Sequence, residues 1–68
     1  MSNWFAKHRQ EWIKETVYVF GYINREHIER KFKVSTPQAS LDLKIFQTEN
    51  KGLLNYNKTS KRYELNGE

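Results

Sequence analysis

Two segments with helical patterning are separated by only two residues, Lys33 and Val34. The apolar residues of both segments recur at helical spacing: Ile28, Phe32, Ala39, Leu43 and Phe46. A connection this short forces consecutive helices to turn sharply and pack against each other, as in a helix-turn-helix. We therefore expect a helix-turn-helix at the centre of the fold.

Capping residues set the limits of these two helices. Asn24 is a strong N-cap candidate for the first, because its side chain can accept a hydrogen bond from the first turn. The second begins with a predicted capping box, with Ser35 at the N-cap and Gln38 at N3. Pro37 is compatible with the first helical turn, where its missing N–H has no helical partner. We expect this second helix to cover residues 36–48.

A further helix is predicted from about residue 3 to Phe20. Helical spacing gives it one face with these residues: Phe5, Trp12, Ile13, Thr16, Val17 and Phe20. The same spacing leaves charged residues outside, including Lys7, Arg9, Lys14 and Glu15. Gly21 suits the end of this helix, and Tyr22–Ile23 has room only for a very short strand.

The C-terminal part of the chain predicts a β-hairpin. Leu54 and Tyr56 alternate before the polar stretch 57–61, and Tyr63 and Leu65 alternate after it, so all four are expected to face the core. A hairpin after the third helix makes the helix-turn-helix winged. The predicted fold is mainly α with a small β-hairpin: three helices and a wing in one domain over residues 1–68.

Composition narrows the function. The chain has 68 residues, no Cys and a formal charge of +4, which favours an anionic partner. Two His without Cys do not make a zinc site. There is no apolar stretch of the roughly 20 residues that cross a bilayer, and residues 1–10 lack the apolar core of a signal peptide. We expect a cytoplasmic protein that binds no membrane.

Motifs for catalysis are absent from the sequence. It contains no Ser/His/Asp arrangement, no phosphate-binding glycine loop and no paired carboxylate set. A chain of this length also offers little room for a substrate pocket. We therefore expect neither an enzyme nor a bound cofactor.

The predicted third helix has the properties of a DNA recognition helix, which contacts base edges through its N-terminal end. The apolar residues Ala39, Leu43 and Phe46 are expected to be buried. The opposite, exposed face then carries Pro37, Leu41, Lys44 and Thr48, flanked by Gln38, Ser40 and Ile45. Gln38 can bond adenine or merely cap the helix, and Ser40 can contact a base or have no role. Lys44 suits a phosphate or a guanine.

Other candidate contacts surround this face. Ser35 and Thr36 lie at the helix N-terminus, where free N–H groups favour a phosphate. Leu41, apolar and exposed, suits a thymine methyl group or another subunit. The candidate backbone contacts elsewhere are basic: Arg25 near the start of the second helix, and Lys58, Lys61 and Arg62 of the wing. The wing cations suit phosphates or the minor groove, although a basic turn also occurs as a solvated loop that protects an edge strand.

Two functions from different classes remain. The first is a regulator that binds double-stranded DNA with helix 36–48 in the major groove and the 57–62 wing on the backbone or minor groove. The second is a protein-interaction module with Leu41, Ile45 and the Trp residues as its contact surface. DNA is favoured because Asp42 is the only acidic residue within 36–48, whereas the exposed face carries polar and basic side chains.

The sequence also resembles a known family. The run Val34-Ser35-Thr36-Pro37-Gln38-Ala39-Ser40-Leu41-Asp42-Leu43 is similar to the N-terminal winged helix of WYL-domain transcriptional regulators, those of bacterial phage-defence loci above all. Ile23-Asn24-Arg25, Leu54-Asn55-Tyr56 and Lys61-Arg62-Tyr63 extend the resemblance over roughly residues 10–65.

This resemblance implies a homodimeric repressor on a palindromic operator. It places Thr36, Gln38, Ser40 and Lys44 on the recognition helix and Lys58 and Lys61 on the wing. Regulators of this family continue into a ligand-sensing WYL domain and a C-terminal dimerisation domain. We therefore expect either the DNA-binding domain of a longer regulator with a C-terminal sensor domain, or a stand-alone relative.

Overall fold

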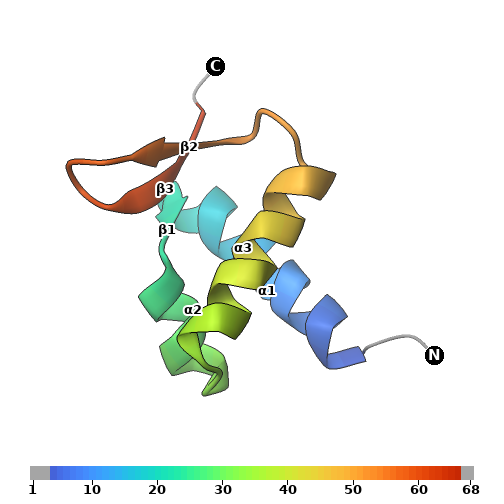
Figure 1. Ribbon diagram of the computed structural model, residues 1–68. Coiled ribbons are helices and arrows are strands. Elements are labelled where there is room, and N and C mark those ends of the chain that lie inside the picture. The colour runs from blue at the N-terminus through green and yellow to red at the C-terminus, as the bar shows by residue number, and fades with distance from the viewer. Residues whose placement is uncertain (1–3, 67–68) are drawn as a thin grey trace.

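The computed structural model describes residues 4–66 and confirms the predicted winged helix-turn-helix. The elements follow in this order: α1 (Trp4–Phe20), β1 (Tyr22–Ile23), α2 (Arg25–Phe32), α3 (Thr36–Glu49), β2 (Leu54–Asn57) and β3 (Arg62–Leu65). Figure 1 shows α3 crossing in front of α1, with α2 beside it and the β2–β3 wing extending from one end of the helical body. The third helix therefore has α1 and α2 behind it and one side open.

A small antiparallel sheet connects the wing to the helices. Its strand order is β1-β3-β2, so the short strand at Tyr22–Ile23 pairs with the second strand of the hairpin. Ile23 lies opposite Tyr63, and Tyr63 lies opposite Tyr56 on the other side. Because β1 directly precedes α2, this pairing holds the wing next to the start of α2.

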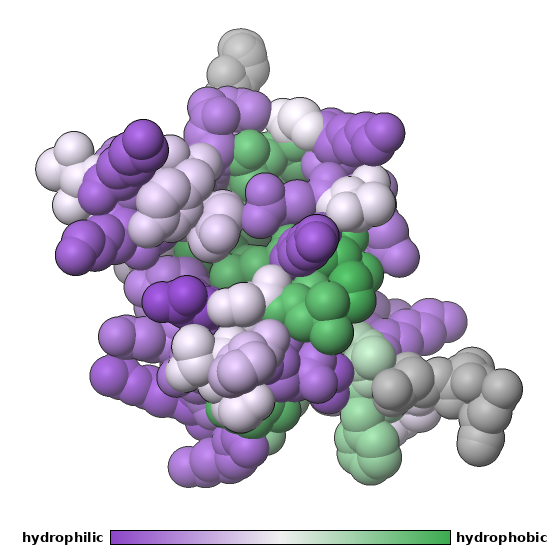
Figure 2. Space-filling view, viewed as in Figure 1, coloured by the Kyte–Doolittle hydropathy of each residue, from purple (hydrophilic) through white to green (hydrophobic). Residues whose placement is uncertain are grey.

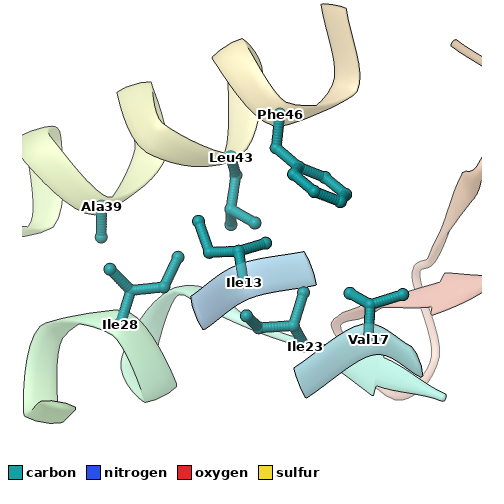
Figure 3. Close-up of a cluster of buried hydrophobic side chains, with 7 residues drawn as sticks. All are labelled: Ile13, Val17, Ile23, Ile28, Ala39, Leu43 and Phe46. Carbon is teal, nitrogen blue, oxygen red and sulfur yellow. The ribbon is translucent and has the colours of Figure 1, made fainter. Parts of the chain in front are cut away.

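The core is formed by seven apolar side chains from all three helices and β1: Ile13, Val17, Ile23, Ile28, Ala39, Leu43 and Phe46. In Figure 3, Ala39, Leu43 and Phe46 project from α3 toward side chains of α1, α2 and β1. The predicted burial of these three residues is confirmed. Phe32, which was expected to be buried with Ile28 on α2, is only partly buried and lies edge-on against Trp12 with ring centroids 5.4 Å apart.

Both helix starts of the helix-turn-helix have the predicted N-caps. The Asn24 side chain accepts a hydrogen bond from the backbone N–H of His27 (3.1 Å), and His27 Nδ1 accepts one from Asn24 N–H (3.3 Å). Ser35 Oγ accepts from the backbone N–H of Gln38 (3.3 Å). The predicted capping box at Ser35 is wrong in its second half, because the Gln38 side chain donates to Asp42 instead.

The predicted buried face of α1 is correct only in the middle of the helix. Ile13, Thr16 and Val17 are buried, whereas Phe5 and Phe20 are 69% and 68% exposed. All buried residues of α1 lie between positions 13 and 17, so the neighbouring elements cover only its middle turns. Helical spacing identifies a face but not how much of its length is covered.

Arg9 was expected in solvent, and this expectation is wrong. Arg9 Nε lies 2.7 Å from Asp42 Oδ2, and the two side chains are 12% and 1% exposed. Gln10 of α1 also donates through Nε2 to the backbone oxygen of Asp42 (2.8 Å). These polar contacts join α1 to α3 beside the apolar core.

The wing is organised by side-chain hydrogen bonds. Asn57 Oδ1 accepts from the backbone N–H groups of Thr59 (2.9 Å) and Ser60 (3.1 Å), which shapes the turn between β2 and β3. The Glu64 carboxylate accepts from Arg62 Nε (2.9 Å) and from the Asn57 side chain (3.3 Å). These hydrogen bonds, Arg62 first, hold the pKa of Glu64 below its usual value.

One aromatic side chain of the wing departs from the predicted pattern. Leu54, Tyr63 and Leu65 pack against the core as expected. Tyr56, in contrast, is half exposed and lies against Tyr63, with ring centroids 4.8 Å apart. Tyr56 lies on β2, an edge strand of the sheet, whereas its partner Tyr63 lies on the central strand β3, so only Tyr63 reaches the core.

Replacing Phe46 by Ala tests the packing of α3. The loss of a buried Phe side chain costs about 3–5 kcal/mol, against a total stability of roughly 3–10 kcal/mol for a chain of this size. We expect Phe46→Ala to be largely unfolded even before urea is added, as followed by circular dichroism. Phe20→Ala removes the same atoms from an exposed position and should change stability by less than about 0.5 kcal/mol. Equal losses for both variants would contradict the assigned core.

Glu64 should make the wing sensitive to acid. A carboxyl with a lowered pKa in the folded state stabilises the fold above its unfolded pKa, and this stabilisation is lost as the pH falls through the folded pKa. The free energy of unfolding should therefore be higher for the parent than for Glu64→Gln at pH 6, and the difference should shrink toward pH 3. A difference that stays constant between the two pH values would show that the ionised carboxylate contributes nothing.

Candidate nucleic-acid interface

The exposed face of α3 is the one expected from the sequence. Pro37, Leu41, Lys44 and Thr48 are all exposed, and Leu41 retains 49% of its accessible surface. The flanking residues Gln38, Ser40 and Ile45 are partly buried. The exposed face thus presents a cation and an apolar side chain side by side, without an acidic residue between them.

A hollow lies between this face and the wing. It is lined by side chains of α3, the residues after it and β3: Ser40, Lys44, Gln47, Thr48, Lys51 and Tyr63. Ser40 and Lys44 were expected here, whereas Lys51 and Gln47 were not. Gln47 follows Lys44 by three residues within α3, which is the spacing that could have indicated a shared face, whereas Lys51 lies beyond the end of the helix.

A second hollow lies between the start of α2 and the wing. Its lining comes from both elements: Asn24, Arg25, Glu26, Tyr56, Ser60, Lys61 and Tyr63. Tyr63 lines both hollows, so they adjoin at this side chain. We call the combined area the α3–wing surface; its cations are Arg25, Lys44, Lys51 and Lys61. Three separate elements therefore contribute positive charge to one surface.

Gln38 and Ser40 border the exposed face of α3 from opposite sides. Two residues correspond to about 200° around a helix. Gln38 points toward α1, where its Nε2 donates to Asp42 Oδ1 (3.0 Å), while Ser40 lines the hollow beside the wing. The structure thus places these two side chains, both expected to flank the exposed face, on its two opposite edges.

The remaining predicted residues fall into two groups. Ser35, Thr36, Lys58 and Lys61 are exposed, although the Ser35 hydroxyl already caps α3. Arg62 is engaged within the protein: its Nε lies 2.9 Å from Glu64 Oε2, and its guanidinium carbon lies 4.1 Å from the ring centroid of Tyr22. Among the three predicted wing cations, Arg62 is therefore held against β1 and β3.

Acidic residues near the α3–wing surface are neutralised by neighbours. Glu26 lies 3.7 Å from Arg30 across one helical turn, and Glu64 is paired with Arg62. The net charge of the α3–wing surface is therefore positive. In Figure 2, hydrophilic side chains cover most of the face viewed, around a smaller apolar area near its middle.

The chemistry of this surface suits a polyanion. Lysine and arginine side chains, hydroxyl groups and a helix start are the groups that contact phosphates. Within residues 4–66, no group of three or more metal-ligating side chains comes together. The same part of the chain has no helix that is both long and apolar enough to cross a membrane.

Comparison with known proteins supports this description. Residues 6–68 match the family model of the BrxR transcriptional regulator winged helix-turn-helix domain. No curated protein matches the chain. The match spans nearly the whole sequence and agrees with the three helices and wing of the structure. The chain therefore belongs to the winged helix-turn-helix family of BrxR transcriptional regulators.

Proposed function

We propose that this domain binds double-stranded DNA in a sequence-specific manner, with α3 in the major groove. The observation that supports this most strongly is that the hollow beside α3 and the hollow beside α2 share Tyr63 and are both lined by cations. A recognition helix contacts base edges while its surroundings hold the backbone. In this proposal Gln38, Ser40 and Leu41 face the bases.

In this proposal, the contacts to the DNA backbone come from the two hollows beside the wing. Lys61 and Arg25 line one hollow, and Lys44 and Lys51 line the other, so cations from both hollows reach phosphates that flank one groove. Lys58 in the exposed turn extends to the next phosphates or into the minor groove. Thr36 offers its hydroxyl and its backbone N–H to a phosphate at the start of α3, while the Ser35 hydroxyl caps the N–H of Gln38.

The resemblance to WYL-domain regulators extends this proposal to the whole regulator. We propose a bacterial, cytoplasmic repressor that binds a palindromic operator as a homodimer, with sensing by a domain C-terminal to this one. The exposed apolar side chains of α1 supply a contact area remote from α3 for such assembly: Trp4, Phe5, Tyr18, Val19 and Phe20. Isolated exposed apolar residues are ordinary, but three consecutive ones, such as Tyr18, Val19 and Phe20 at the end of α1, are typical of a contact surface.

A protein-interaction module is the second candidate function. It is favoured by a largely apolar groove beside α1 and α2, lined by Trp12, Thr16, Phe20, Tyr22, His27 and Arg30. Of the residues first expected to contact a protein, this groove contains Trp12 but neither Leu41 nor Ile45. The two functions therefore use different surfaces, and variants can separate them.

Selection from a randomised duplex library, followed by salt titration, tests the proposed DNA binding. We expect the chain to enrich a defined sequence, here called the selected duplex. Each phosphate contact contributes about 0.9 to the slope of log K against log salt. Lys44→Ala and Lys61→Ala should therefore each flatten this slope by about 0.9, on selected and random duplex alike.

Lys14→Ala is the matched control, because Lys14 is an exposed lysine of α1 outside both hollows. It should leave the slope unchanged. If all three variants keep the parent slope, or if Lys14→Ala has the largest effect, the α3–wing surface is not where DNA binds. Failure to enrich any sequence would remove the claim of specificity.

A further inference from the structure

Asp42 is the most deeply buried charged side chain of α3, and its carboxylate has three hydrogen-bond donors. Arg9 donates from Nε to Oδ2 (2.7 Å) and from Nη2 to Oδ1 (3.3 Å), and Gln38 donates from Nε2 to Oδ1 (3.0 Å). Only 1% of the Asp42 side chain is exposed. The buried carboxylate thus connects a side chain of α1 to a side chain at the edge of the DNA-facing surface.

The chemistry of the carboxylate fixes the orientation of the Gln38 amide. An ionised carboxylate only accepts hydrogen bonds, so the NH₂ group of Gln38 must face Asp42 and its oxygen must point away. One N–H of Gln38 is occupied by Asp42, while Oε1 and the second N–H remain for a ligand. One acceptor and one donor side by side form the pattern that pairs with an adenine edge.

We propose that Asp42, held by Arg9, is a positioning residue that fixes the Gln38 amide for contact with a base. This inference rests on the proposed function and adds to it how a base-contacting side chain is oriented. A free glutamine loses rotamer freedom when it binds, whereas one already held by Asp42 has lost it on folding. Asp42 itself touches no DNA, because it is buried.

Stability alone is a weak reason for this arrangement. A buried ion pair is often replaceable by apolar residues of similar size without loss of stability, because both charges must leave water. Breaking the pair at one end would instead leave a buried charge without a partner. The informative variant therefore removes both charges together, as Arg9→Met/Asp42→Leu.

A double-mutant cycle between this pair and Gln38 separates positioning from structure. The quantity measured is discrimination, the ratio of affinities for the selected and random duplexes. In the parent, Gln38→Ala should lower discrimination by about tenfold or more. Arg9→Met/Asp42→Leu with Gln38 intact should lower it by about three- to tenfold. When Gln38→Ala is added to the variant that lacks the Arg9–Asp42 pair, discrimination should fall by no more than about a further threefold, because nothing holds the Gln38 amide in that variant.

Ser40→Ala is the matched control, since Ser40 lies on the opposite side of the exposed face and has no contact with Asp42 among those the structure gives. Its effect on discrimination should be the same in both backgrounds. If Gln38→Ala costs the same factor with and without the Arg9–Asp42 pair, the positioning role is wrong while DNA binding stands. If the Ser40→Ala effect also changes, the whole helix has moved and the inference is equally overturned.

A DNA-free measurement keeps the inference falsifiable if the charge-free variant does not fold. In the NMR spectrum of the parent, the Gln38 side-chain amide should show two well-separated protons with slowed solvent exchange. Gln47, on the same helix and without a described side-chain hydrogen bond, supplies the reference signal. A Gln38 amide that matches Gln47 would overturn the positioning role, whereas failure of the parent to bind any duplex would overturn the proposed function and this inference together.

Discussion

Burial of Ala39, Leu43 and Phe46 against α1, α2 and β1 is the constraint on which the rest of this structure depends (Figure 3). Side chains keep fixed angular positions around a helix axis, so burial of these three residues makes Leu41 and Lys44 face outward. The stripe therefore selects the side chains available to a ligand. The same face could not be presented if Phe46 lost its place in the core, which couples the stability of so small a domain directly to its function.

A second requirement is that positive charge from distant parts of the chain reaches the same surface as α3. Pairing of β1 with β3 achieves this, because it holds the wing beside the start of α2 and brings Arg25 and Lys61 to one hollow. Tyr63 contributes to both hollows and so links the wing to Lys44. The two-residue strand β1 is therefore more important for the arrangement of the surface than its length indicates.

Local signals in the sequence predicted most of the fold. The short connection between α2 and α3, the N-caps and the apolar spacing of α3 depend on neighbours a few positions away. The N-caps and the spacing were confirmed, and the connection is short, with three residues between the two helices. The Arg9–Asp42 pair joins residues 33 positions apart, so no local pattern indicates it. The commitment of Arg62 to Tyr22 and Glu64 likewise depends on strand pairing. Charge alone therefore identified candidate contacts, but tertiary structure decides which cations remain available.

The central claim is that α3, the wing and the start of α2 act as one DNA-binding surface. Backbone amide NMR shifts on addition of the selected duplex test it most directly. We expect the largest changes within residues 36–48, with further changes at 58–63 and at Arg25, while Tyr18 and Val19 on the exposed side of α1 stay unchanged. Changes concentrated on α1, with α3 and the wing unaffected, would contradict the account and favour a protein-interaction module.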